Sequence, residues 1–118
     1  MTTAAPALPL AALTMQDLLD REAIRDCLHR YCRGIDRMDE ACLKSVYWPD
    51  AMDRHGPYQG TATGFVKWAL EKLKDSPRGV HMLSNILIDL RGEVAGVESY
   101  FHALQVDQDE HGKAREVM

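Results

Sequence analysis

The 118-residue sequence lacks long apolar runs and any concentration of basic charge. Pro6 and Pro9 interrupt its Ala/Leu-rich start, and no apolar segment approaches the ~20 residues that a membrane-spanning helix needs. Fourteen Lys and Arg against eighteen Asp and Glu give a net charge of −4, and the basic residues are dispersed. Because nucleic-acid-binding surfaces gather Lys and Arg on one face, we expect neither a nucleic acid nor a membrane as partner.

Cysteine is also scarce, and its pattern carries no metal or redox motif. Cys27, Cys32 and Cys42 form an odd set without a CxxC pair, which is typical of buried thiols in a reducing compartment. The start lacks the Lys or Arg that opens a secretory signal, so we predict a cytoplasmic protein. No Walker or dinucleotide glycine pattern occurs, and we expect no cofactor.

The length fits one domain, and its first half has helical periodicity. We expect residues 1–13 to form a flexible arm and residues 14–118 to form the domain. Thr14 and Asp17 resemble a capping box, and apolar residues then recur every three or four positions as far as Ile35. This pattern predicts an amphipathic helix of about 20 residues.

Two shorter helices are predicted after the first one. Asp39 can cap a helix that continues to Tyr47, before Pro49 ends it. Residues 55–60 (HGPYQG) favour a turn, and His55 is interpreted as a surface turn residue. A third helix is predicted to open at Thr61 or Thr63 and to end within residues 74–79, where Ser-Pro-Arg-Gly follows.

The pattern changes to strands at residue 80. Residues 80–90 and 94–106 are strand-like, and Arg91-Gly92 between them indicates a hairpin link. Residues 108–113 suggest the next turn, and residues 114–118 begin another strand. Helices followed by antiparallel strands predict an α+β fold.

An Arg91-Gly92 link would place His81 opposite His102. The same register would gather both polar and apolar side chains on one sheet face, namely Leu83, Asn85, Leu87, Glu98 and Tyr100. A pocket wall accommodates both kinds of residue, whereas a solvated face or a core does not. The prediction depends on the register, because one bulge would separate the two histidines.

Two segments carry a resemblance to a known family. They are RYCRGIDRMDEACLKSVYWPDA and, after a Phe/Trp-containing helix, HMLSNILIDLRGEVAGVESYFHA. This order resembles the SnoaL-like branch of the nuclear transport factor 2-like superfamily, with scytalone dehydratase, bile-acid 7α-dehydratase and hexachlorocyclohexane dehydrochlorinase as the most similar members. The resemblance spans about residues 15–106. It is specific for the fold and much less so for one activity.

The resemblance implies a cone-shaped α+β barrel, with helices packed on a curved antiparallel sheet that encloses a pocket. It also implies four catalytic positions. Asp36 matches the acidic residue at the end of the first helix, and His81 matches the strand histidine that this carboxylate orients. Tyr31 and His102 match further pocket residues, each a proton-donor option. Family members continue into further strands, so we expect either a truncated chain or a partner that completes the sheet.

The chemistry of these residue types suits elimination. A histidine can remove a proton near neutral pH, and a carboxylate on its other ring nitrogen fixes the tautomer. Together with the resemblance, which implies the reaction type and the substrate class, this predicts a lyase, a dehydratase or dehydrohalogenase in type, that acts on a small cyclic hydrophobic substrate without a cofactor. The alternatives are a non-catalytic ligand-binding or assembly subunit, such as the small subunit of a ring dioxygenase, and a ketosteroid-isomerase-like isomerase.

Several side chains have both a structural and a functional interpretation. We predict that the substrate-binding residues are Asn85, Tyr100, Tyr47 and Trp68, although aromatic residues at the helical spacing of the last two more often belong to a core. A metal site formed by His81 and His102 with Asp36 or Glu98 is conceivable, but the family resemblance implies no metal. The same resemblance implies a homodimer or homotrimer that uses the exposed sheet face.

Overall fold

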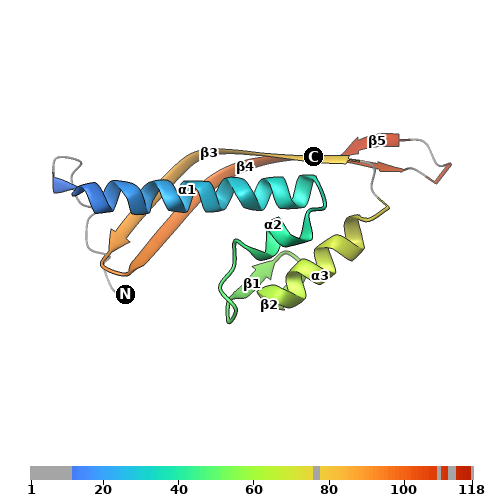
Figure 1. Ribbon diagram of the computed structural model, residues 1–118. Helices are drawn as coiled ribbons and strands as arrows, with labels where there is room; N and C mark the ends of the chain where they lie inside the picture. Colours follow the sequence, from blue (N-terminus) through green and yellow to red (C-terminus); the bar gives the residue numbers. More distant parts are fainter. Residues whose placement is uncertain (1–11, 76–77, 109, 112–113, 118) are drawn as a thin grey trace, which may run out of the picture.

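The computed structural model describes residues 12–75, 78–108, 110–111 and 114–117. Most of the predicted N-terminal arm therefore lies outside the described residues. In chain order the elements are α1 (Met15–Asp36), α2 (Glu40–Lys44), β1 (Met52–His55), β2 (Tyr58–Thr61), α3 (Ala62–Leu73), β3 (Arg78–Arg91), β4 (Val94–Gln108) and β5 (Ala114–Val117). In Figure 1, β3 and β4 run alongside α1, and the other helices and the short hairpin cluster near its C-terminal end. This is an α+β arrangement with antiparallel sheets, as the sequence predicts.

The first helix confirms its predicted capping box. The Thr14 hydroxyl accepts a hydrogen bond from the Asp17 backbone N–H at 3.1 Å, and the Asp17 carboxylate accepts one from the Thr14 N–H at 2.8 Å. These two bonds satisfy backbone donors that the first turn of a helix leaves without partners. The helix ends at Asp36, so this carboxylate lies at the end of α1 that is near α2 and α3 (Figure 1).

The second and third helices begin as predicted, but α2 is shorter than expected. Asp39 caps α2 through the Cys42 N–H, and Thr61 caps α3 through the Gly64 N–H. The helix α2 ends at Lys44 rather than at Tyr47. Residues 52–61 form the β1–β2 hairpin, which the sequence analysis predicted only as a turn. Gly56 takes a positive φ of 55° in that turn, a conformation that glycine adopts without strain.

The buried core lies where α1, α2 and α3 meet. Its members are Ile35, Leu43, Phe65, Val66 and Ala69, here called the helical core. Gly34 lets α1 and α2 approach closely, since a Cβ at this position would lie 2.9 Å from the Leu43 backbone. The tightest packing of the described residues therefore adjoins Asp36 directly.

The β3–β4 hairpin does not have the predicted register. Its two-residue link is Gly92-Glu93, and Gly92 takes φ 63° at the first turn position, as a type II′ turn requires. A second shift falls between Ser84 and Leu87, where Asn85 has φ 50°. These features are the physical reason that the predicted Arg91-Gly92 register was wrong.

The corrected register changes which residues share a face. His81 lies opposite Ala103, while His102 lies opposite Met82 and therefore on the other face of the ribbon. Within the described residues, β3–β4–β5 and β1–β2 are separate sheets, and the predicted β5 is present. No helix in the part of the chain that the structure describes is long and apolar enough to cross a membrane.

Candidate functional site

A carboxylate and a histidine meet where α1 ends against β3. The Asp36 Oδ1 atom lies 2.6 Å from the His81 Nδ1 atom, and Asp36 Oδ2 accepts a hydrogen bond from the His81 backbone N–H at 3.0 Å. The two side chains are 20% and 23% exposed, respectively. One carboxylate therefore holds both the backbone and the ring of the same residue, which fixes the imidazole orientation.

The contact with Asp36 determines which nitrogen of the His81 ring carries the proton. An ionised carboxylate only accepts hydrogen bonds, so the Nδ1 atom that faces Asp36 carries the proton. The other ring nitrogen, Nε2, then has a free lone pair in the neutral imidazole. His81 lines two adjacent cavities, so this lone pair belongs to a group that ligands can reach.

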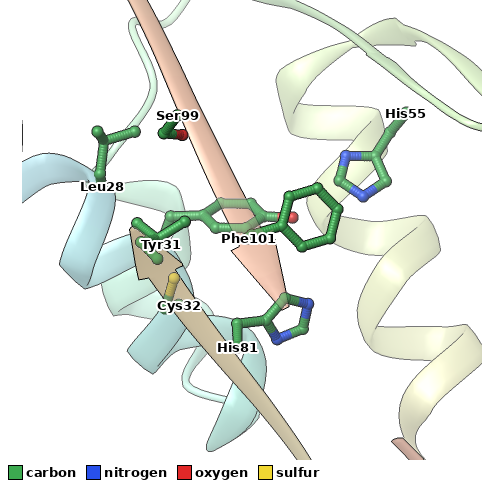
Figure 2. Close-up of a pocket in the computed structure, with 8 residues that line it drawn as sticks. Leu28, Tyr31, Cys32, His55, His81, Ser99 and Phe101 are labelled. Carbon is green, nitrogen blue, oxygen red and sulfur yellow. The ribbon is translucent and has the colours of Figure 1, made fainter. Parts of the chain in front are cut away.

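The two cavities have volumes of about 260 and 250 Å³. The first is largely apolar, and its lining includes Leu28, Leu83 and Phe101. The second extends toward α3 and includes Trp68 and Lys72. Tyr31, His55 and His81 line both cavities, and Figure 2 shows these three side chains around the Phe101 ring.

Tyr31 stands between the two histidine rings. Its ring centroid is 6.3 Å from that of His81, at an interplanar angle of 84°, and 6.3 Å from that of His55. Burial raises the pKa of the Tyr31 hydroxyl well above its usual value, and the negative charges of nearby groups such as Asp53 add to this. Tyr31 is therefore a neutral phenol that can donate a hydrogen bond into the cavity.

His55 is the site residue that the sequence analysis missed. It was interpreted as a surface turn residue, but it ends β1 and its ring packs on Phe65 with centroids 4.6 Å apart. Its Nδ1 atom lies 3.7 Å from the Asp53 Oδ1 atom, and the Tyr47 hydroxyl donates to Asp53 Oδ2 at 2.7 Å. The alternation of Asp53 and His55, which puts both on one side of a strand, was the available signal.

The structure does not bring the other predicted residues of the hairpin to these cavities. His102 and Tyr100 lie on the opposite face of the ribbon from His81, and both are exposed. Asn85 occupies the irregular part of β3 and is exposed too. The conceivable metal site fails for the same reason, since His81 and His102 do not share a face. Among the described residues, no three His, Cys, Asp or Glu side chains are grouped as metal ligands.

The two aromatic candidates have different positions. Trp68 lines the second cavity and contacts Tyr58 and Phe65. Tyr47 contacts Phe65 edge-on and binds Asp53, so its connection to the site runs through that carboxylate. Burial, followed by the hydrogen bond to Asp53, raises the pKa of Tyr47.

Comparison with protein families identifies the chain's family. The model of the SnoaL-like domain matches residues 16–118, so the chain belongs to this family of the NTF2-like superfamily. This agrees with the resemblance drawn from the two sequence segments. A search of curated proteins finds no match.

Two solved structures are similar in fold. A protein from Novosphingobium aromaticivorans DSM 12444, named as a candidate scytalone dehydratase, matches with a TM-score of 0.69 and 20% identity over 88% of this chain and 83% of that one. The Kfla4162 protein from Kribbella flavida matches with a TM-score of 0.67 and 11% identity, over 75% of this chain. The match spans 65% of the Kribbella protein. At these identities the likeness supports the fold.

Proposed function

We propose that this protein is a lyase that eliminates water from a small cyclic hydrophobic substrate, with His81 as the base and Asp36 as its positioning residue. The observation that carries the proposal is the 2.6 Å contact between Asp36 Oδ1 and His81 Nδ1, beside two apolar-walled cavities. The fold-level likeness to a protein named as a candidate scytalone dehydratase agrees with this chemistry. The proposed reaction uses only residues of this chain.

In the proposed reaction His81 Nε2 takes a proton from a carbon next to a substrate carbonyl. The electron pair of that C–H bond forms the new double bond, and the C–O bond to the departing hydroxyl breaks. Asp36 stabilises the imidazolium that forms on His81. The neutral Tyr31 phenol donates a hydrogen bond to a substrate oxygen, which stabilises the negative charge that develops there.

The lining of the cavities suits a compact apolar ring with one polar end. Leu28, Leu83 and Phe101 provide apolar contact in the first cavity, while Tyr31 and His81 provide the polar groups at its junction with the second. Ligand sites commonly combine a mostly apolar wall with few convergent polar groups. Trp68 is the further substrate-contacting residue that we propose, because it lines the second cavity.

The test is a panel of cyclic β-hydroxy ketones, with formation of the conjugated enone followed by ultraviolet absorbance. We expect His81→Ala to lower kcat/KM by about 10²–10⁴-fold, the usual contribution of a positioned general base. Asp36→Asn should also lower it steeply, because its amide donates toward Nδ1 and favours the tautomer that leaves Nε2 protonated. His29→Ala, at an exposed position of α1, is the matched control. Circular dichroism checks that each variant folds.

Full activity of His81→Ala would contradict the base role. The two alternative functions predict other outcomes. An isomerase of the ketosteroid type needs a free carboxylate as base, so it would lose activity with Asp36→Asn and keep it with His81→Ala. A ligand-binding subunit would bind panel compounds without converting them.

Two further proposals concern the closure of the fold around the cavities and the association of copies of the chain. We propose that a closed cone surrounds the two cavities and that copies of the chain associate through the outer face of β3 and β4. That face carries exposed apolar side chains, including Met82 and Leu87, which support an association surface. Light scattering on the purified protein measures the oligomeric state.

A further inference from the structure

We propose that His55 is the acid that gives a proton to the departing hydroxyl, and that Asp53 is its positioning residue. This inference rests on the proposed lyase function and adds a second carboxylate–histidine pair to the same site. The first pair joins α1 to β3, whereas the second lies on β1, so the two come from different parts of the chain.

The location of His55 carries the argument. His55 and His81 both line the two cavities, and the Tyr31 ring lies 6.3 Å from each of their rings. In Figure 2 the His55 ring approaches from the side of α3 and the His81 ring from β3, with the Tyr31 hydroxyl between them. A substrate at this junction can therefore meet the base on one side and an acid on the other.

The surroundings of His55 suit a group that exchanges protons. Its ring is 48% exposed and its Nδ1 atom lies 3.7 Å from Asp53, whose side chain is only 12% exposed. Tyr47 fixes the Asp53 carboxylate through a 2.7 Å hydrogen bond, and Phe65 packs against the imidazole ring of His55 with ring centroids 4.6 Å apart. The Asp53 carboxylate accepts a proton-bearing Nδ1 as its neighbour, which orients the ring so that Nε2 is left for the substrate. Solvent access allows the ring to be reprotonated after each turnover.

The step balances with these two histidines. As His81 Nε2 accepts the carbon-bound proton, the His55 imidazolium transfers a proton to the departing oxygen, and water leaves. The protein then holds a proton on His81 and lacks one on His55, and exchange with solvent restores both. Tyr31 suits this transfer poorly, because burial raises the pKa of its phenol and makes full proton loss costly.

Several titratable or charged groups face His55 and contribute to its pH response. Asp53 lies on the same strand, Tyr31 comes from α1, His81 from β3 and Lys72 from α3. Tyr47 acts through Asp53. The experiment therefore compares leaving groups within one protein, so that these surroundings stay constant.

The experiment measures kcat/KM for 3-hydroxycyclohexanone and 3-chlorocyclohexanone with four proteins: wild type, His55→Gln, His81→Ala and His29→Gln. Chloride leaves as an anion and needs no proton, whereas the hydroxyl group must gain a proton to leave as water. We expect His55→Gln to lose about 10²–10⁴-fold with the hydroxyl compound and little with the chloro compound. His81→Ala should lose activity with both, and His29→Gln with neither. The pH profile of His55→Gln should lose its alkaline limb, and Asp53→Asn should weaken that limb.

Each other outcome overturns a specific claim. Equal losses of His55→Gln with both compounds would make His55 a structural or binding residue, and unchanged activity with both would remove it from the reaction. In either case a loss in His81→Ala would leave the proposed function intact. Activity of His81→Ala with both compounds, or no turnover of either compound by the wild-type protein, would reject the lyase function and this inference together.

Discussion

The helical core and the β3–β4 ribbon differ sharply in how they bury apolar surface. Leu43 in the helical core is 0% exposed, whereas Leu87 on the outer face of the ribbon is 66% exposed. Where α1, α2 and α3 meet, the facing side chains of all three helices bury one another. Along the ribbon, α1 covers only one face, and Figure 1 shows the far end of the ribbon extending beyond that helix. The candidate site lies at the boundary between these regions.

This boundary position explains the geometry of the site. Asp36 follows directly on the tightly packed Ile35 and Gly34, so its carboxylate is held by a rigid element. His81 comes from the ribbon, and its backbone and ring both bind that carboxylate. The packed helical core holds the Asp36 carboxylate in a fixed position, and the ribbon leaves the His81 ring within reach of a ligand. This combination suits a binding or catalytic site.

The largest effect is expected from replacing a leucine by alanine, once in the helical core and once on the ribbon. Leu43→Ala should lower the free energy of unfolding by about 2–5 kcal/mol, because it leaves a cavity in a packed interior. Leu87→Ala should change it by less than about 0.5 kcal/mol, as exposed positions usually do. Urea denaturation followed by circular dichroism measures both. Similar losses for the two variants would show that the ribbon's outer face is covered in solution.

A smaller effect is expected from adding one methyl group to a glycine in each region. Gly34→Ala places a Cβ against the Leu43 backbone, which must move, and we expect a loss of about 1–3 kcal/mol. At Gly96 of β4 a Cβ would meet no atom within 4 Å, so Gly96→Ala should be neutral or slightly stabilising. A higher urea midpoint for Gly34→Ala than for the wild type would contradict the close approach of α1 and α2.

The smallest effect is expected on the loss of stability at low pH. The Cys42 backbone N–H, followed by the Arg33 side chain, lowers the pKa of Asp39 below its ordinary value of 3.8. The unfolded chain therefore binds this proton first, so the stabilisation is present above about pH 4 and is lost as the pH falls through the lower, folded value. Asp39→Asn keeps a capping oxygen and should reduce the fall in Tm between pH 6 and pH 3. An unchanged fall would exclude Asp39 as a contributor.

The helices were largely predictable because their signals are local. Thr14 and Asp39 cap their helices as predicted, and Thr61 is one of the two caps predicted for α3; each acts through contacts within three residues. The short β1–β2 strands were missed, since four-residue strands around a Gly-Pro turn give no periodic pattern. The end of α2 was also misjudged, which is common where a short helix depends on its neighbours.

The site was predictable in part. Asp36, His81 and Tyr31 followed from a family resemblance, and the structure brings these three side chains together. His102 followed from the resemblance and from the predicted hairpin register, and Tyr100 followed from that register alone. Two backbone features overturn the register, namely the positive φ of Gly92 and the irregularity at Asn85. A shift of one residue moves a side chain to the other face of a strand.

The sequence by itself determined the helix boundaries that capping residues set, the α+β order of elements and the family. Only the tertiary structure decided the register of β3 against β4 and the position of His55 beside Tyr31. The physical reason is the distance along the chain over which each kind of interaction acts. Caps and periodicity act within a few residues, whereas cavities form from residues that α1, β1, α3 and β3 bring together across the whole chain.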